Sequence, residues 1–129
     1  MTLLLDSTVL IDVLRGRPAG ERLRRLAAAG TPLLTTAINV EEMVRGLRRS
    51  ESSAAEALLA ALRVLPVRGQ DGVVAGQWRR DHAARGVTLS QADCLIAACA
   101  LGIGATLATG NVADFPMDDL VVEHWPVGR

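Results

Sequence analysis

Lysine is absent from this sequence of 129 residues, so arginine supplies all 14 basic side chains. Arginine carries a planar fork of hydrogen-bond donors that suits phosphate groups. Fourteen acidic residues balance the arginines, and a formal net charge of zero gives no support for nucleic-acid binding. The arginines occur in clusters, which solvated helix faces and a biased coding composition would also explain. The lack of lysine also limits which reactions the acidic residues could carry out.

Aromatic and sulfur-containing side chains are scarce as well. Tyrosine is missing, phenylalanine occurs once and tryptophan twice. This excludes a broad aromatic platform on which nucleic-acid bases could stack. The two cysteines, Cys94 and Cys99, form no Cys-x-x-Cys or Cys/His pair. Their spacing argues against a structural zinc site and predicts reduced thiols.

Long uninterrupted apolar segments are missing too. Asp6 and Asp12 interrupt the N-terminal apolar run, so no secretory signal is visible. Residues 94–113 carry no charge, but Gly102 and Gly110 break this stretch. A helix followed by a strand fits it better than a membrane span. We therefore expect a cytoplasmic protein without membrane association.

Short apolar runs alternate with longer helical patterns along the chain. Half of the residues are hydrophobic and the mean hydropathy is +0.27, at a length that fits one domain with a real core. We predict strands near residues 3–5, 32–36, 64–67, 105–109 and 120–122, and helices near 9–14, 18–29, 39–47, 52–62, 71–85 and 90–101. Pro66 indicates an edge position for the third strand or the end of that strand. The alternation predicts an α/β fold whose parallel sheet is covered by helices on both faces.

Four acidic residues stand where the chain passes from a strand, or from the loop after one, towards a helix. They are Asp6, Glu42, Asp93 and Asp114. In an α/β sheet such positions converge at the carboxyl ends of the strands. Carboxylates gathered there repel one another unless a cation lies between them. An all-carboxylate set favours Mg²⁺ or Mn²⁺, which prefer oxygen ligands.

Each acid also has a purely structural interpretation. Asp6 could be the N-cap of the helix that follows it. Asn39 and Glu42 have the spacing of a capping box, and so do Ser90 and Asp93. The fourth acid could simply be solvated in its loop. Capping does not require acids after several different strands, however, whereas a metal site at one sheet edge does, so the four together favour the metal site.

Aspartyl phosphoryl transfer on a flavodoxin-like fold is another explanation for an aspartate after a strand. Enzymes of this kind combine Mg²⁺ with a lysine that steadies the phosphoryl group, and this chain has no lysine. The related phosphatases also need a second aspartate two positions after the first, where this chain has Thr8. Both absences argue against this class of enzyme.

Four segments together resemble one known family, and they occur in its order and near its spacing. The chain resembles PIN domains, specifically the VapC-type toxins of bacterial VapBC toxin–antitoxin systems, over essentially its whole length. The segments are Leu4–Asp12, Thr36–Met43 with Gly46, Ala92–Ala98 and Thr109–Phe115. Any one of them is weak evidence, and the four together are fairly specific.

This resemblance implies one PIN domain over residues 1–129, folded as a three-layer α/β/α sandwich with a central parallel sheet. It implies a Mg²⁺- or Mn²⁺-dependent ribonuclease in which metal-activated water cleaves the phosphodiester bond. Asp6 and Asp93 would be the main metal ligands, and Glu42 would bind the metal directly or through water. Whether one ion or two is bound stays open.

Other site residues follow from the same resemblance. Asp114 would lie in the outer part of the site or bind a second ion, because Asn111 occupies the alternative position of the last family acid. Thr8 and Asn111 would hydrogen-bond metal-bound waters or orient the carboxylates. Asn39 stands where threonine is common in the family, and Glu41 adds a second acid beside the expected one.

Partners are implied by the resemblance alone. They are a cognate VapB-type antitoxin, a second copy of the chain in a homodimer, and a tRNA or rRNA substrate in the bacterial cytoplasm. Arginines at the rim would hold the RNA phosphates. The candidates are Arg15, Arg17, Arg45, Arg48, Arg79, Arg80 and Arg85. The alternative is a catalytically inactive PIN-like module that binds RNA or a partner.

Overall fold

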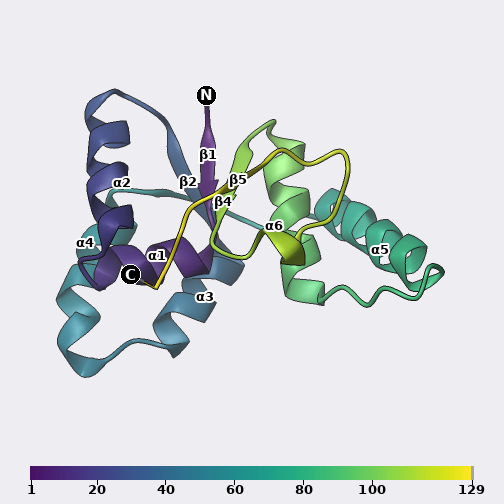
Figure 1. Cartoon of the computed structure of the whole chain (residues 1–129), viewed down its shortest axis with the longest axis horizontal. Helices are drawn as coiled ribbons and strands as arrows, with labels where there is room; N and C mark the ends of the chain where they lie inside the picture. The colour runs from purple at the N-terminus through teal and green to yellow at the C-terminus, as the bar shows by residue number, and fades with distance from the viewer. Residues whose placement is uncertain (129) are drawn as a thin grey trace.

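Five parallel strands form one sheet at the centre of the computed structural model, which describes residues 1–128 (Figure 1). The strand order is β3-β2-β1-β4-β5, and all four neighbouring pairs are parallel. The strands are β1 Leu3–Leu5, β2 Leu33–Thr36, β3 Arg63–Leu65, β4 Thr106–Thr109 and β5 Val122–His124. The predicted parallel sheet is confirmed, and β1 lies at its centre.

Helices connect the strands. They are α1 Ser7–Leu14, α2 Pro18–Ala28, α3 Ala37–Arg45, α4 Ser52–Ala60, α5 Gly69–Ala83 and α6 Gln91–Gly102. Two short 3₁₀ turns, η1 Arg49–Glu51 and η2 Val112–Asp114, complete the elements. None of the helices within residues 1–128 combines the length and the apolar character needed to cross a membrane.

The sheet separates two hydrophobic cores. Leu3 and Leu5 of β1 pack with helices α1 to α4, whereas Leu4 packs with α5 and α6. Successive side chains of a strand point to opposite faces, so the apolar run Leu3–Leu5 serves both cores. Figure 1 shows α1 to α4 on one side of the sheet and α5 and α6 on the other. The predicted three-layer sandwich is confirmed.

Four strands differ from their predicted bounds, and the differences at the third and fifth strands have a physical reason. The third strand ends at Leu65, one residue before Pro66, which cannot donate a backbone hydrogen bond. The predicted edge position of this strand is confirmed. The fifth strand pairs through Val122 to His124 instead of 120–122. Leu120 is buried in the loop before the strand, so its apolar character reflected burial and not strand pairing.

The N-cap of α3 was predicted three residues too late, at Asn39. Thr36 is the N-cap, and its hydroxyl accepts the backbone N–H of Asn39. Asn39 is therefore the third helical residue and not the cap. Glu42 consequently lies within the helix body, where it cannot complete a capping box with Asn39. This correction changes the roles of both residues in the site.

Candidate metal centre

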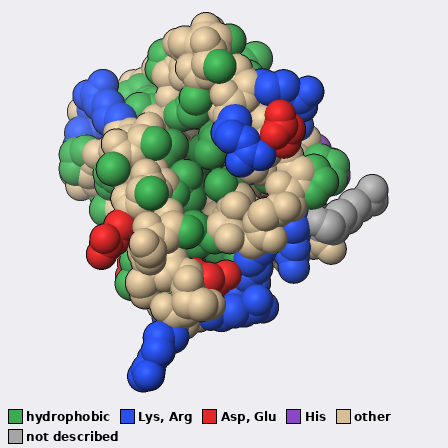
Figure 2. Space-filling model, turned by 90° about the vertical axis from the view of Figure 1, so that its left-hand side faces the viewer, with side chains coloured by type: hydrophobic (Ala, Val, Ile, Leu, Met, Phe, Trp, Pro, Cys, Tyr) green, Lys and Arg blue, Asp and Glu red, His purple; other side chains and the backbone are tan. Residues whose placement is uncertain are grey.

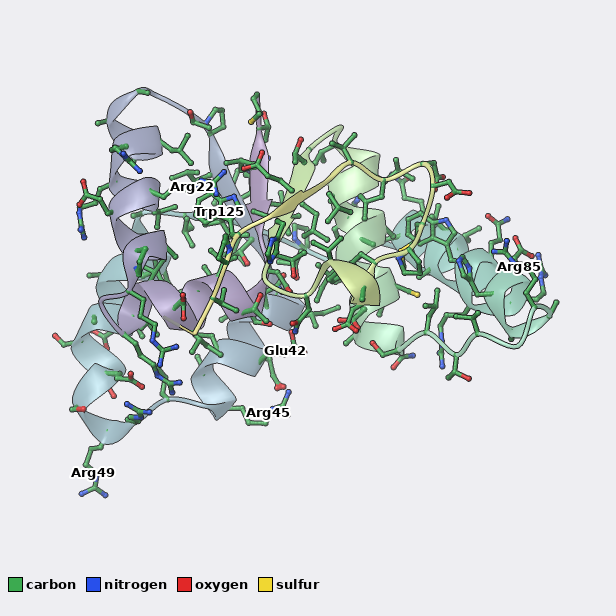
Figure 3. The ribbon with its side chains drawn as sticks, in the orientation of Figure 1. Arg22, Glu42, Arg45, Arg49, Arg85 and Trp125 are labelled. Atoms are coloured by element: carbon green, nitrogen blue, oxygen red, sulfur yellow. The ribbon has the colours of Figure 1, made fainter. Side chains whose placement is uncertain are left out.

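The four acids predicted as a set follow the carboxyl ends of neighbouring strands. Asp6 comes directly after β1, and Glu42 lies on α3, which follows β2. Asp93 lies in the first turn of α6, and Asp114 ends the η2 turn after β4. Figure 3 shows Glu42 at the edge of the molecule where the strands end, on the helix that contacts α6. The fold thus directs all four positions to one edge of the sheet.

Asp6 is held by neutral hydrogen-bond donors. Its side chain is buried, with a residue exposure of 5%. Its Oδ2 accepts hydrogen bonds from the hydroxyls of Thr109 at 2.7 Å and Thr8 at 3.2 Å. Its Oδ1 accepts from the amide of Asn39 at 3.1 Å and from the Ser7 hydroxyl at 3.5 Å. Asp6 does occupy the N-cap position of α1, but its side chain makes no capping bond. The predicted N-cap position is thus confirmed, but capping does not explain the presence of the carboxylate.

Asn39 contributes to this network, a role that the sequence alone did not reveal. Its side chain is completely buried. The side-chain Oδ1 accepts from the Thr36 hydroxyl at 2.7 Å and from the Thr36 backbone N–H at 3.3 Å. These two bonds fix the amide so that its Nδ2 donates to Asp6. Placing the helix cap at Thr36 would have shown that Asn39 is available for this contact.

Glu42 accepts a hydrogen bond from the Ser7 hydroxyl at 3.0 Å. Burial raises the pKa of this carboxyl, and the negative charges of Asp6 and Asp93 raise it further. The Ser7 hydrogen bond and the charge of Arg45 oppose this shift but do not cancel it. The ionised form of Glu42 is therefore disfavoured, and a nearby cation would stabilise it.

Asp93 is half of the predicted capping box. Ser90 is the N-cap of α6, and its hydroxyl accepts the Asp93 backbone N–H at 3.0 Å. The reciprocal bond from the Ser90 backbone to the carboxylate does not form within residues 1–128. Burial raises the pKa of Asp93 against the lowering effect of Ser90, and the charges of Asp114 and Asp6 add to the rise. The carboxylate is thus free of a capping role.

Asp114 and Asn111 lie further out, in the loop after β4. Asp114 is exposed and borders a cavity of about 370 Å³. The cavity is lined by Val87, Thr88, Leu89, Ser90, Asp93, Ala113, Asp114 and Pro116. The Asn111 backbone N–H donates to the Thr109 hydroxyl at 3.0 Å. Its side chain makes no hydrogen bond within the described part of the chain, so the predicted orienting contact with a carboxylate is not made here.

The four acids Asp6, Glu42, Asp93 and Asp114 take part in no ion pair within residues 1–128. Nor do any three acidic, histidine or cysteine side chains of that range, as they stand, form a group that could hold a metal ion. The donors are carboxylate, hydroxyl and amide oxygens, which fit a hard cation that keeps several of its waters. The raised pKa values of Glu42 and Asp93 fit the same conclusion, because a divalent ion favours ionised carboxylates.

Residues 3–115 match the family described as PIN domain. The chain belongs to the PIN-domain family. Ribonuclease VapC19 of Mycobacterium tuberculosis is 33% identical over 115 residues, which cover 88% of this chain and 92% of the relative. Ribonuclease VapC10 of the same species is 35% identical over 119 residues, covering 89% and 86%. The resemblance to VapC-type PIN domains that the sequence indicated is confirmed.

Solved PIN structures show the same fold. VapBC-1 from nontypeable Haemophilus influenzae superposes with a TM-score of 0.80 and 27% identity, covering 97% of this chain and 98% of that one. The match therefore includes α5 and α6 as well as the sheet. It also includes the edge of the sheet where Asp6 and Asp93 lie.

The arginines predicted to border this PIN-domain site are distributed unevenly. Arg15 and Arg17 are engaged by the buried acids Glu51 and Asp12, at 3.3 and 2.8 Å. Others have exposed or backbone partners: Arg45 pairs with Glu41, Arg80 with Asp81, and Arg79 Nε donates to the Leu89 carbonyl. Figure 3 shows Arg45 near Glu42 on α3 and Arg85 well apart from them, beyond α5. Arg45 thus lies near the acid Glu42, and Arg79 contacts Leu89 in the cavity wall. Arg85 lies apart from Glu42.

Proposed function

We propose that this PIN domain is a Mg²⁺- or Mn²⁺-dependent ribonuclease and the toxin of a type II toxin–antitoxin pair in the bacterial cytoplasm. One observation carries the proposal: four acids lie at one edge of the sheet without a basic partner. Relatives of the chain are named ribonucleases, and the acid set is the feature that such an activity would use. Asp6 and Asp93 would hold the cation, Glu42 would complete its ligands, and Asp114 would act from the outer side.

A bound divalent ion would act as a Lewis acid towards the phosphate and would make a bound water easier to deprotonate. The chain's own contribution is positioning. Asn39, Thr8 and Thr109 donate to the two oxygens of Asp6 and thus fix the direction of its carboxylate. All three donors are neutral, so they orient the negative charge without cancelling it. A side chain held in this way loses little entropy when it binds an ion.

RNA would enter beside Asp93 and Asp114. The 370 Å³ cavity next to these acids has an apolar wall that includes Val87 and Leu89. Arg79 donates to the Leu89 carbonyl and so places a positive charge behind this wall. Arg45, paired only with exposed Glu41, is available on the α3 side. Phosphates held by such arginines would offset the repulsion between RNA and the acids.

A cleavage assay tests the enzyme. Purified protein is incubated with tRNA and rRNA in Mg²⁺, in Mn²⁺ and in EDTA, and the 5′ ends of the products are mapped. We expect cleavage only with metal, leaving 5′-phosphate and 3′-hydroxyl ends. The matched variant Asp93→Asn should be inactive while remaining folded. If the wild-type protein cleaves no RNA with either metal, the alternative of an inactive RNA- or partner-binding module is correct. If it cleaves RNA and Asp93→Asn cleaves equally well, the proposed role of Asp93 as a metal ligand is wrong.

The toxin assignment requires an antitoxin surface. Figure 2 views the side formed by α1 to α4 and shows hydrophobic side chains gathered at its centre, with arginines around them. Half-buried apolar residues on this side are Leu14, Leu26 and Leu59 of the helices and Leu47 of the loop after α3, and Val44 is 50% exposed. A VapB-type antitoxin segment with apolar and acidic side chains would complement such a surface. The solved relative from Haemophilus influenzae is described as VapBC-1.

Binding can be tested with matched surface variants. Val44→Asp places a charge on the α1–α4 side, and Val73→Asp places one on the opposite layer, on α5, where Val73 is 60% exposed. Only Val44→Asp should weaken co-purification with the antitoxin encoded beside the gene. If both variants bound the antitoxin equally well, the proposed antitoxin surface on the α1–α4 side would be wrong. Light scattering of the isolated chain would test the proposed homodimer.

A further inference from the structure

Gly110 follows β4 immediately and lies directly beneath Val127. A Cβ atom at position 110 would be 2.5 Å from Val127 Cγ2 and 2.8 Å from Cγ1. Real Cβ contacts are essentially never below 3.0 Å. Gly110 does not have a positive φ angle, so its backbone conformation is open to other residues. The need for glycine at this position therefore comes from the contact with Val127.

The backbone beside Gly110 supports Asp6. The Gly110 N–H donates to the Thr8 hydroxyl at 3.0 Å, and that hydroxyl donates to Asp6 Oδ2 at 3.2 Å. The neighbouring Thr109 hydroxyl donates to the same oxygen and accepts the Asn111 N–H. Two of the donors to Asp6 are therefore controlled by the position of residues 109–111. A displacement of this run would release both of them.

Val127 belongs to a segment that is anchored on both sides. The Trp125 N–H donates to the Thr109 carbonyl at 2.9 Å, and Trp125 is only 1% exposed. Arg22 lies over the Trp125 ring, 4.2 Å from its centroid, and Figure 3 shows the two side chains together. Beyond Val127, the Gly128 N–H donates to Asp12 Oδ1 at 3.0 Å. These anchors prevent Val127 from moving away from Gly110.

We infer that Val127 is a positioning residue for the acidic site: anchored by Trp125 and Gly128, it packs on Gly110 and keeps residues 109–111 in the place where Thr8 and Thr109 hydrogen-bond Asp6. The inference rests on the proposed nuclease function for its consequence in catalysis. The contact itself is independent of that function. Val127 acts through Gly110 and touches no substrate.

The test introduces a steric clash at position 110 and then removes it with a second substitution. Gly110→Ala introduces a methyl group that Val127 does not accommodate, and the double variant Gly110→Ala/Val127→Ala removes both Cγ atoms. The remaining Val127 Cβ would be 3.2 Å away, which a small shift relieves. Gly102→Ala is a control for a steric clash elsewhere, because its Cβ would be 2.8 Å from Arg68 Nη2 and 3.5 Å from Asp71 Oδ1, atoms outside the run 109–111 that supports Asp6.

Three measurements are compared for each variant: hydrogen exchange of the amide at position 110, the Mn²⁺ concentration that half-saturates the thermal shift, and RNA cleavage. Gly110→Ala should speed the exchange and weaken Mn²⁺ binding and cleavage about 10- to 100-fold, as for other residues that orient metal ligands. The double variant should recover most of each loss. Val127→Ala alone should lose less than Gly110→Ala does, and Gly102→Ala should match the wild type.

Two results would overturn the inference. One is a double variant as impaired as Gly110→Ala in exchange and Mn²⁺ binding. The other is a Gly110→Ala variant that equals the wild type in both. If the wild-type protein cleaves no RNA while the loss and recovery of amide protection and Mn²⁺ binding occur as described, the nuclease proposal fails and the positioning role stands.

Discussion

The protein contains two groups of buried or half-buried acids, and their surroundings differ. Asp12, Glu51 and Asp71 each contact an arginine, namely Arg17, Arg15 and Arg68. The second group, Asp6, Glu42 and Asp93 at the sheet edge, has hydroxyl and amide partners or none. Both groups therefore lose contact with water, but only the acids of the first group form ion pairs that compensate for this loss.

This difference distinguishes acids that stabilise the fold from acids that are kept for a ligand. The pKa of Asp71 shows the first case: burial alone would raise it, but the hydrogen bonds and charge of Arg68 outweigh burial and lower it. Glu42 and Asp93 show the second case, because burial raises the pKa of both and neighbouring acids add to the rise. Folding alone gives no reason to retain such a group, whereas binding of a cation does.

The largest expected effect is on catalysis. Asp93→Asn removes a proposed metal ligand, and the loss of several kcal/mol of charge stabilisation corresponds to a decrease in cleavage rate on the order of 10³-fold. The rate is measured with Mn²⁺ on a fixed RNA, and Asp71→Asn is the control at an arginine-paired acid. If Asp71→Asn reduced the metal-dependent rate as strongly without unfolding, the comparison between the two groups would fail.

The next effect is on stability and should occur only at the paired acid. Asp71→Asn weakens charge-assisted hydrogen bonds to Arg68. We expect the free energy of unfolding in EDTA to fall by about 1–3 kcal/mol, measured by urea denaturation. Asp93→Asn should not destabilise the metal-free protein, because it removes an uncompensated charge. Equal destabilisation by the two changes would show that Asp93 also supports the fold.

Asn39→Ala tests whether a neutral donor is sufficient to orient Asp6. The change removes the amide that donates to Asp6 Oδ1 at 3.1 Å. Mn²⁺ binding, measured by calorimetry, should weaken about 10- to 100-fold. Asn39→Thr, the residue common in the family, should recover part of the affinity by restoring a donor. Wild-type affinity in Asn39→Ala would mean that Thr8 and Thr109 orient Asp6 without it.

The smallest effect concerns pH, and its direction differs between the two groups. Because the pKa of Asp93 is raised in the folded protein, the unfolded chain loses this proton first as pH rises above the ordinary value of 3.8. The unfolding free energy of the metal-free protein then falls and remains lower above the folded-state pKa. Asp93→Asn lacks this loss, so its stability relative to the wild type should rise with pH and then level off.

The contribution of Asp71 to the free energy of unfolding changes with pH in the opposite direction. Its pKa is lowered in the folded protein, so its contribution to stability is present above the ordinary value of 3.8 and disappears as pH falls through the folded-state pKa. Urea denaturation in EDTA between pH 3 and 7, with wild type and both variants, separates the two contributions. Difference curves of the same sign for Asp71→Asn and Asp93→Asn would contradict the assignment.

Much of the architecture was predictable from local patterns. The apolar run Leu3–Leu5 indicated a buried strand that ends at Asp6, and Ser90 marked the start of α6. These signals depend on neighbours in the sequence, so a single chain reveals them. The four acids were found in the same way, because each follows a recognisable strand or helix boundary. Their metal-binding roles remain predictions.

The donors around Asp6 were not predictable to the same extent. Thr109 reaches Asp6 across 103 residues and Asn39 across 33. Such contacts depend on the order of strands in the sheet, which local patterns do not define. Asn39 was also hidden by the wrong position of the helix cap, since Thr36 seemed to belong only to the strand. Gly110 gave no sign of its contact with Val127, because that contact too joins distant parts of the chain.

The pairing of β1 with β4 has a consequence for protein synthesis. A ribosome completes Asp6, Asn39 and Glu42 long before it adds Asp93 and Thr109. The central strand β1 therefore waits for its partner β4, and the shortest hydrogen bond to Asp6 closes only after residue 109 has left the exit tunnel. The nascent chain would carry an incomplete acidic site until Thr109 emerges, which would delay any activity of the site until then.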